Sequence, residues 1–135
     1  MITGGCLCGT IRYRAQGAPS CETNCHCTTC RRAGAAPFVP WASFDSVDFI
    51  FERGEPRRYR SSADVGRTFC ANCGTPLTYQ RLPHQIDVTI CSMDDPARVR
   101  PRDHTWVSHQ LPWVVLGDGL PRHQETRTIE EGSEG

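Results

Sequence analysis

The chain has 135 residues, equal numbers of acidic and basic side chains, and a hydrophobic share of 38%. This length suits one domain, and a formal net charge of zero excludes an overall basic field that would attract nucleic acid. No apolar run is long enough to span a bilayer, and residues 1–9 lack the pattern of a signal peptide. We therefore expect a cytoplasmic, loop-rich domain with no membrane or nucleic-acid partner, in which thiols bind metal rather than form disulfides.

Apolar and polar residues alternate in several short segments, which predicts a mainly β fold. Strands are expected at 11–15, 37–44, 47–51, 75–80, 86–90 and 113–116. One or two helical turns are expected at 28–33, and no long amphipathic helix. Residues 1–123 are expected to form a single zinc-binding domain, and the polar, acidic residues 124–135 a flexible tail.

Seven of the nine cysteines fall into three clusters. These are Cys6 and Cys8; Cys25, Cys27 and Cys30; and Cys70 and Cys73. Closely spaced thiolates bind soft divalent ions, above all Zn²⁺. The first and last clusters together supply the four sulfurs of a closed, structural zinc site, in which the glycine after each pair allows a sharp turn. Buried thiols without a metal are the alternative.

The central cluster has three cysteines within six residues, so a fourth ligand must come from elsewhere. Water, an exogenous thiol, Cys21, Cys91 or a histidine could supply it. Three protein ligands and one exchangeable position are typical of catalytic zinc. A second closed structural site, or a site that binds zinc weakly, is the alternative. If Cys21 and Cys91 are not ligands, we expect them to be small buried side chains.

Several polar residues near the central cluster have two interpretations each. His26 lies between candidate ligands, so its ring is expected to point away from their metal, as a support for the site or as a surface residue. Arg31 and Arg32 could bind a carboxylate of a ligand or simply be solvated. An aromatic and imidazole-rich stretch follows at His104, Trp106, His109 and Trp113. Core packing of its tryptophans is favoured over lining a pocket.

The order and surroundings of the three clusters resemble the glutathione-dependent formaldehyde-activating enzyme family, whose domain is shared with centromere protein V. The matching segments are 5–13, 25–32, 69–75 and 104–121. The resemblance implies a tent-like fold of small antiparallel sheets around a structural zinc, with few short helical turns. It implies one zinc on Cys6, Cys8, Cys70 and Cys73 and a second on Cys25, Cys27 and Cys30. It associates the second zinc with glutathione and its formaldehyde adduct.

These features predict a zinc-dependent carbon–sulfur lyase-type enzyme, similar to S-(hydroxymethyl)glutathione synthase, acting on a glutathione-like thiol and a small aldehyde or their adduct. Catalysis would centre on the three central cysteines, with Arg31 or Arg32 holding a carboxylate of the thiol. A non-catalytic zinc- and thiol-binding protein is the alternative. A zinc module for nucleic acid or protein is less favoured, although Arg57, Arg58 and Arg60 form a local basic run. The oligomeric state is left open.

Overall fold

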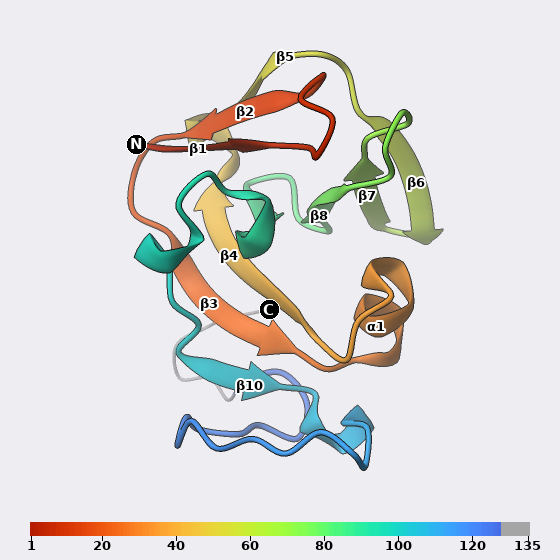
Figure 1. The fold of residues 1–135 in the computed structure, drawn as a ribbon, viewed down its shortest axis with the longest axis vertical. Helices are drawn as coiled ribbons and strands as arrows, with labels where there is room; N and C mark the ends of the chain where they lie inside the picture. The colour runs from red at the N-terminus through yellow and green to blue at the C-terminus, as the bar shows by residue number, and fades with distance from the viewer. Residues whose placement is uncertain (128–135) are drawn as a thin grey trace. The chain divides into compact units, whose positions relative to one another are not determined.

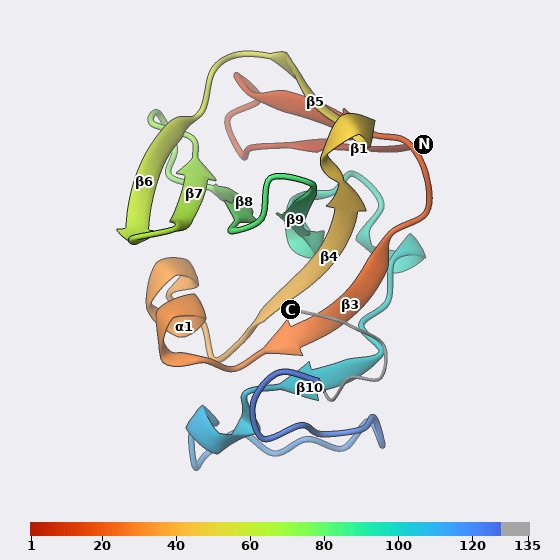
Figure 2. The ribbon, with the colours of Figure 1, turned by 180° about the vertical axis from the view of Figure 1, so that it is seen from behind.

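The computed structural model describes residues 1–127 and divides into two compact units. Unit 1 consists of Met1–Ser20 and Ala42–Val99, and unit 2 consists of Cys21–Trp41 and the chain from Arg100 onward. Strands make up most of the regular structure, and the described residues contain one α-helix (Figures 1 and 2). The predicted mainly β class is confirmed. Within residues 1–127, no helix has the length and apolar character needed to cross a membrane.

Unit 1 contains two sets of paired strands. Its first set is an antiparallel sheet in the order β1 (Ile2–Gly5), β2 (Arg12–Ala15) and β5 (Phe49–Arg53). Its second set runs in the order β9 (Gln85–Thr89), β8 (Pro76–Gln80), β7 (Val65–Phe69) and β6 (Arg57–Ser62), all antiparallel. β4 (Val39–Asp45) begins in unit 2 and ends in unit 1. Short 3-10 turns lie at Ser46–Asp48, Ile90–Ser92 and Pro96–Arg98.

The core of unit 1 is apolar and includes the alternating residues that the sequence indicated. Buried side chains from most of its strands form one cluster: Ile2, Cys6, Ile11, Tyr13, Ala15, Ala42, Phe44, Cys70, Leu77, Ile86, Val88, Ile90, Met93 and Val99. Tyr13 lies against Gly4, where a Cβ would collide with its hydroxyl, and hydrogen-bonds Ser92 at 2.7 Å. Burial raises the pKa of Tyr13 to about 12. Two candidate metal ligands, Cys6 and Cys70, belong to this core.

Unit 2 is built around two parallel strands and one short helix. β3 (Ser20–Cys25) pairs with β10 (Asp103–Thr105), and α1 (Thr28–Gly34) follows directly after β3 (Figure 1). A 3-10 turn at Val107–His109 follows β10. On the other edge of β10, the backbone of His104 exchanges hydrogen bonds with Pro121 and His123 at 2.9 and 2.8 Å. The helical turn predicted at 28–33 is confirmed.

Several sequence-based expectations fail where the pattern was apolar but the chain turns. Residues 113–116 form no strand, and the Trp113 side chain, expected in the core, is 67% exposed. Val47 is 92% exposed because it lies in a 3-10 turn before β5. Conversely, the sequence pattern does not predict β1 (Ile2–Gly5), β3, β6, β7 or β10, of which β3 and β6 are mostly polar.

The segment expected to be a tail begins with residues that make defined contacts. The backbone carbonyls of Gln124 and Glu125 accept hydrogen bonds from Ser108 and Trp106 at 3.2 and 2.9 Å. Arg127 pairs with the buried Asp103 at 2.7 Å. Residues 128–135 lie outside the described part of the chain.

Candidate metal centres

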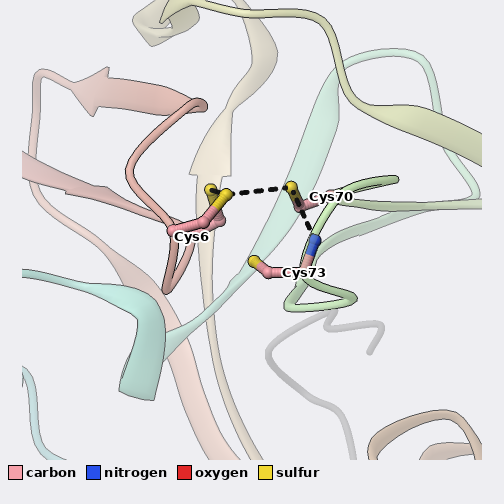
Figure 3. A group of neighbouring side chains, drawn as sticks. Cys6, Cys70 and Cys73 are labelled. Carbon is pink, nitrogen blue, oxygen red and sulfur yellow. Dashed lines mark hydrogen bonds between the residues drawn. The ribbon is translucent and has the colours of Figure 1, made fainter.

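Four cysteines of unit 1 bring their sulfur atoms together in what we call the four-sulfur group. Cys6 and Cys8 follow β1, and Cys70 and Cys73 follow β7, so two loops far apart in sequence converge (Figure 3). All four sulfurs lie within 4.8 Å of one another. Cys8 lies 3.6 Å from Cys6 and 3.8 Å from Cys70, measured between Sγ atoms. This arrangement could hold one metal ion with four ligands.

The two loops of the four-sulfur group have the same backbone design. In the first, the Cys6 N–H donates to the Ile11 carbonyl at 3.1 Å; in the second, the Cys70 N–H donates to the Thr75 carbonyl at 3.0 Å. Each loop closes through a glycine, Gly9 or Gly74, with φ of +81° and +84°. A Cβ at either glycine would meet no atom within 4 Å, so the left-handed backbone alone favours glycine.

Hydrogen-bond donors surround the sulfurs of the four-sulfur group. The backbone N–H of Ile11 donates to Cys6 Sγ at 3.3 Å, and the side-chain amide of Asn72 donates to Cys8 Sγ at 3.3 Å. Hydrogen bonds from Thr10 and Asn72 lower the pKa of Cys8 to about 5. Hydrogen bonds from Thr75 lower the pKa of Cys73 to about 7. These donors favour thiolates, which are the form of cysteine that binds metal.

Three cysteines of unit 2 form a second cluster, the three-sulfur group. Cys25 ends β3, Cys27 caps the N-terminus of α1, and Cys30 lies in the first turn of that helix. Their sulfurs lie within 4.8 Å of one another, and among residues 1–127 no fourth His, Cys, Asp or Glu atom joins the group. Cys25 and Cys30 are buried, whereas Cys27 is half-buried. The cluster could therefore hold a metal with three protein ligands.

The conformation of the capping residue gathers the sulfurs of the three-sulfur group. Cys27 has an extended backbone, and its Sγ accepts a hydrogen bond from the Cys30 N–H at 3.3 Å. The Thr29 hydroxyl lies 3.2 Å from the same sulfur. Hydrogen bonds within the group, first of all between Cys25 and Cys27, lower the pKa of Cys27 and raise that of Cys25. The cluster thus favours a thiolate at Cys27, its most accessible sulfur.

His26 is fully buried, so the interpretation as a surface residue is wrong. Its Nε2 lies 3.0 Å from His104 Nδ1, and His104 Nε2 lies 2.8 Å from Asp118 Oδ2. Phe38 packs against the His26 ring at a centroid distance of 4.7 Å. Burial, followed by the nearby His104, lowers the pKa of His26 to about 4. The ring lies outside the three-sulfur group, and Asp118 is a member of this network that sequence reasoning missed.

The parallel register of β3 and β10 explains how His26 and the sulfurs separate. His104 is paired with Asn24, and Thr105 is paired with Cys25. Because successive side chains of a strand point to opposite faces, Asn24, His26 and His104 share one face and Cys25 the other. The His26 N–H extends this ladder by donating to the Thr105 carbonyl at 3.0 Å.

The two arginines after the three-sulfur group differ in their surroundings. Arg31 is half-buried; its Nη2 donates to the Thr28 hydroxyl at 3.3 Å, and its buried Nε has no hydrogen-bond partner among the described residues. Arg32 is exposed. Neither forms a salt bridge to a carboxylate of residues 1–127. The His109 ring accepts the Thr28 N–H at 3.3 Å, which holds the start of α1.

The two remaining cysteines are less buried than expected. Cys91 is exposed and Cys21 is half-buried, and neither belongs to a metal-binding group among the described residues. All nine cysteines lie within residues 1–127, and none forms a disulfide. Cys91 therefore provides an accessible thiol outside both groups.

The basic run noted in the sequence lies on β6. Arg58 and Arg60 line a hollow of about 550 Å³ together with Arg81 and Gln80. Arg58 lies across Gly66 of the neighbouring strand, where a Cβ would come within 2.9 Å of its Nε. The basic run thus lies on one edge strand, and Arg81, just after β8, adds a fourth arginine beside it.

Comparisons with known proteins place this geometry in a family. One curated relative, an uncharacterized lyase of Schizosaccharomyces pombe, is 34% identical over 76 residues; the match covers 56% of this chain and 55% of the relative. This chain thus matches about half the length of that relative. A crystal structure of a Rhodobacter sphaeroides protein has a similar fold, with a TM-score of 0.59, 21% identity, and coverage of 90% of this chain and 98% of the other. The family model described as glutathione-dependent formaldehyde-activating enzyme matches residues 1–109, so the chain belongs to that family.

Proposed function

We propose that this protein is a zinc-dependent carbon–sulfur lyase-type enzyme that joins a glutathione-like thiol to a small aldehyde such as formaldehyde, or cleaves their adduct. The observation that carries the proposal is the three-sulfur group, which has no fourth ligand among residues 1–127, in a chain of this family. The name of the S. pombe relative, a lyase, supports the same reaction class.

The donor sets of both sulfur groups fit zinc. Cysteine thiolates are preferred ligands of this ion, and the hydrogen bonds to Cys8, Cys27 and Cys73 favour the thiolate form. We assign a structural ion to the four-sulfur group and a catalytic ion to the three-sulfur group. When bound in the three-sulfur group, zinc would supply Lewis acidity that lowers the pKa of a substrate thiol.

The protein residues around the three-sulfur group would control access to it and orient the substrate thiol. Cys25 and Cys30 are buried, so a substrate would reach the group from the side of the more accessible Cys27. Exposed Arg32, which has no carboxylate partner among residues 1–127, would hold a carboxylate of the thiol. In the reaction, the thiol sulfur bonds to the carbonyl carbon, and the proton lost by the thiol ends on the carbonyl oxygen as a hydroxyl.

Zinc content and adduct kinetics test the proposal together. We expect two zinc ions per wild-type chain and one in Cys27→Ser, with wild type forming the glutathione–formaldehyde adduct at least about tenfold faster than the uncatalysed reaction. Cys91→Ser, which changes an exposed cysteine outside both groups, should match wild type in both measurements. Wild-type protein that binds glutathione without accelerating the reaction would instead support the non-catalytic thiol-binding alternative.

A further inference from the structure

The hydrogen bonds that connect Asp118, His104 and His26 have a single direction when both rings are neutral. The Asp118 carboxylate can only accept, so His104 must carry its hydrogen on Nε2 and donate to Oδ2 across 2.8 Å. His104 Nδ1 is then an acceptor, so His26 must carry its hydrogen on Nε2 and donate across 3.0 Å. The tautomer of His26 is therefore determined by a carboxylate two hydrogen bonds away.

This chain of bonds leads from solvent to the centre of the sulfur-bearing loop. The Asp118 side chain is 42% exposed, that of His104 is 1% exposed, and His26 is fully buried. Asp118 is itself oriented, because its Oδ1 accepts the Leu120 N–H at 3.0 Å. The buried end of this series of hydrogen bonds is His26 Nδ1, which has no hydrogen-bond partner among the described residues.

Because His26 Nδ1 has no partner among the described residues, the direction of the hydrogen bonds between Asp118, His104 and His26 affects the stability of the fold. A buried acceptor without a partner is already costly, and a buried N–H without an acceptor adds a cost of the order of 1–3 kcal/mol. With hydrogen on Nε2, the His26 donor is satisfied and only the lone pair is left. The reverse tautomer would leave a buried N–H facing no acceptor among residues 1–127.

We propose that Asp118 is a positioning residue that, through His104, holds His26 as the Nε2–H tautomer and thereby fixes the backbone between Cys25 and Cys27. His26 is the residue between these two sulfurs, and its own N–H is bound to Thr105. Anchoring both its ring and its backbone restricts the chain on each side, which holds the sulfurs in the arrangement that a ligand requires. The proposal rests on the proposed function only in taking the three-sulfur group as the zinc site.

The variant that tests this is Asp118→Asn, because an amide at this position is expected to reverse the direction of both hydrogen bonds. The Leu120 N–H still needs an acceptor, so the amide oxygen would take that position and the NH₂ group would face His104. His104 would then accept at Nε2 and donate from Nδ1, and His26 would be driven to the Nδ1–H tautomer. Asp118→Glu retains a carboxylate and should restore at least part of the wild-type behaviour. Asp64→Asn makes the same chemical change at an exposed aspartate of unit 1.

Three measurements follow on the full chain. Long-range ¹H–¹⁵N spectra of the imidazoles should show Nε2–H for both histidines in wild type and Nδ1–H in Asp118→Asn. Exchange of the His26 amide should become at least about tenfold faster in Asp118→Asn than in wild type, while exchange of the Cys70 amide of unit 1 is unchanged. Chelator competition should show about tenfold weaker zinc binding at the three-sulfur group and less than a twofold change at the four-sulfur group. Asp64→Asn should match wild type throughout.

The outcomes separate this proposal from the proposed function. An Nδ1–H tautomer for His26 in wild type overturns the positioning role, as does a reversed tautomer that leaves both exchange and zinc affinity unchanged. Equal losses at both sulfur groups would indicate general destabilisation and would also overturn it. If wild type takes up no zinc at the three-sulfur group, the proposed function fails, and the tautomer and exchange results on that protein still decide the positioning role.

Discussion

The two units of this chain bury different kinds of side chain. Unit 1 has a continuous apolar core, and its buried polar groups, among the described side chains, are those of serine and threonine and the Tyr13 hydroxyl. Unit 2 buries four ionisable side chains other than cysteine: Glu22, His26, Asp103 and His104. Apolar burial stabilises a fold directly, whereas buried ionisable groups are costly unless they are hydrogen-bonded and are common at functional sites. The contrast agrees with the proposal that unit 1 chiefly stabilises the chain and that unit 2 holds the reactive site.

Backbone strain follows the same division. The described residues other than glycine with positive φ are Cys21, Ala35 and Trp106, and all three belong to unit 2. Such conformations cost about 1–2 kcal/mol for L-residues, and they persist where the surrounding structure or a function requires them. In unit 1, the tight loops at the four-sulfur group use glycine instead, at Gly9 and Gly74. The two metal-binding loops of unit 1 therefore adopt their left-handed backbone without strain, whereas unit 2 contains three residues in a strained backbone conformation.

The strongest test of this comparison removes one sulfur from each group. Cys70→Ser should unfold unit 1 at 25 °C or lower its free energy of unfolding by several kcal/mol, because the residue is both a buried core residue and a candidate zinc ligand. Cys27→Ser should leave the unfolding of unit 1 within about 0.5 kcal/mol of wild type. Thermal and urea unfolding followed by circular dichroism measure both. Equal damage from the two variants would contradict the division into a structural and a functional cluster.

The next largest effect is expected in the polar interior of unit 2. Asp103 is 5% exposed and accepts from Arg127 Nε at 2.8 Å, with His123 Nε2 at 3.3 Å. Asp103→Ala leaves the largely buried Arg127 guanidinium without its carboxylate partner, which should cost about 3 kcal/mol in urea unfolding. Asp103→Ala combined with Arg127→Met should recover part of that loss, because no unpaired charge is left. A double variant as unstable as the single one would show that the ion pair is not what matters.

Sequence reasoning located the sulfur groups because their information is local. Spacing within the pairs and the triplet determines which sulfurs can reach a common point, and the glycines after Cys8 and Cys73 signal the turns. The partners of His26 could not be found this way. They depend on a parallel pairing of two strands that brings His26 to His104, 78 residues away, and on a turn that lies still further along the chain.

The misplaced strands have a related cause. β6 is polar on both faces because it is the last strand in its sheet, so it shows no alternation of apolar residues. The apolar stretch around Trp113 looked like a strand but forms turns, with Trp113 largely exposed. Periodicity reports burial, and it fails where a strand is exposed on both faces or an apolar segment remains at the surface.

A smaller effect probes the strain in unit 2. Ala35 ends α1 with φ of 49°, is exposed, and donates its N–H to the Arg31 carbonyl. Ala35→Gly removes the left-handed penalty of about 1–2 kcal/mol and adds roughly 0.4–1 kcal/mol of unfolded-state entropy, for a net gain of about 0.5–1 kcal/mol. Ala33→Gly, inside the same helix and also exposed, should instead lose about 1 kcal/mol. Two changes of the same sign would show that the helix end is not strained.

The smallest effect lies in unit 1 and depends on pH. Burial raises the pKa of Asp87, although Ser43 and Gln85 donate to its Oδ1 at 2.6 and 3.2 Å. A carboxyl whose pKa is higher in the folded state destabilises the fold when ionised. Asp87→Asn keeps the accepting oxygen and removes the charge, so it should gain a few tenths of a kcal/mol at neutral pH.

That gain should shrink as the pH falls through the folded-state pKa of Asp87 and vanish below its ordinary value near 4. Asp94 supplies a control of opposite sign in the same unit, because its hydrogen bonds from Arg12 lower the pKa of its carboxyl. Asp94→Asn should therefore lose stability at neutral pH and approach wild type as acid protonates Asp94. Urea midpoints from pH 8 down to pH 4 distinguish the two, because over this range the gain at Asp87 shrinks whereas the loss at Asp94 stays constant and disappears only below pH 4. A gain at Asp87 that is independent of pH would mean that burial of its charge is not the cause. The ionised Asp87 carboxylate would then not destabilise unit 1, in keeping with the otherwise apolar core of that unit.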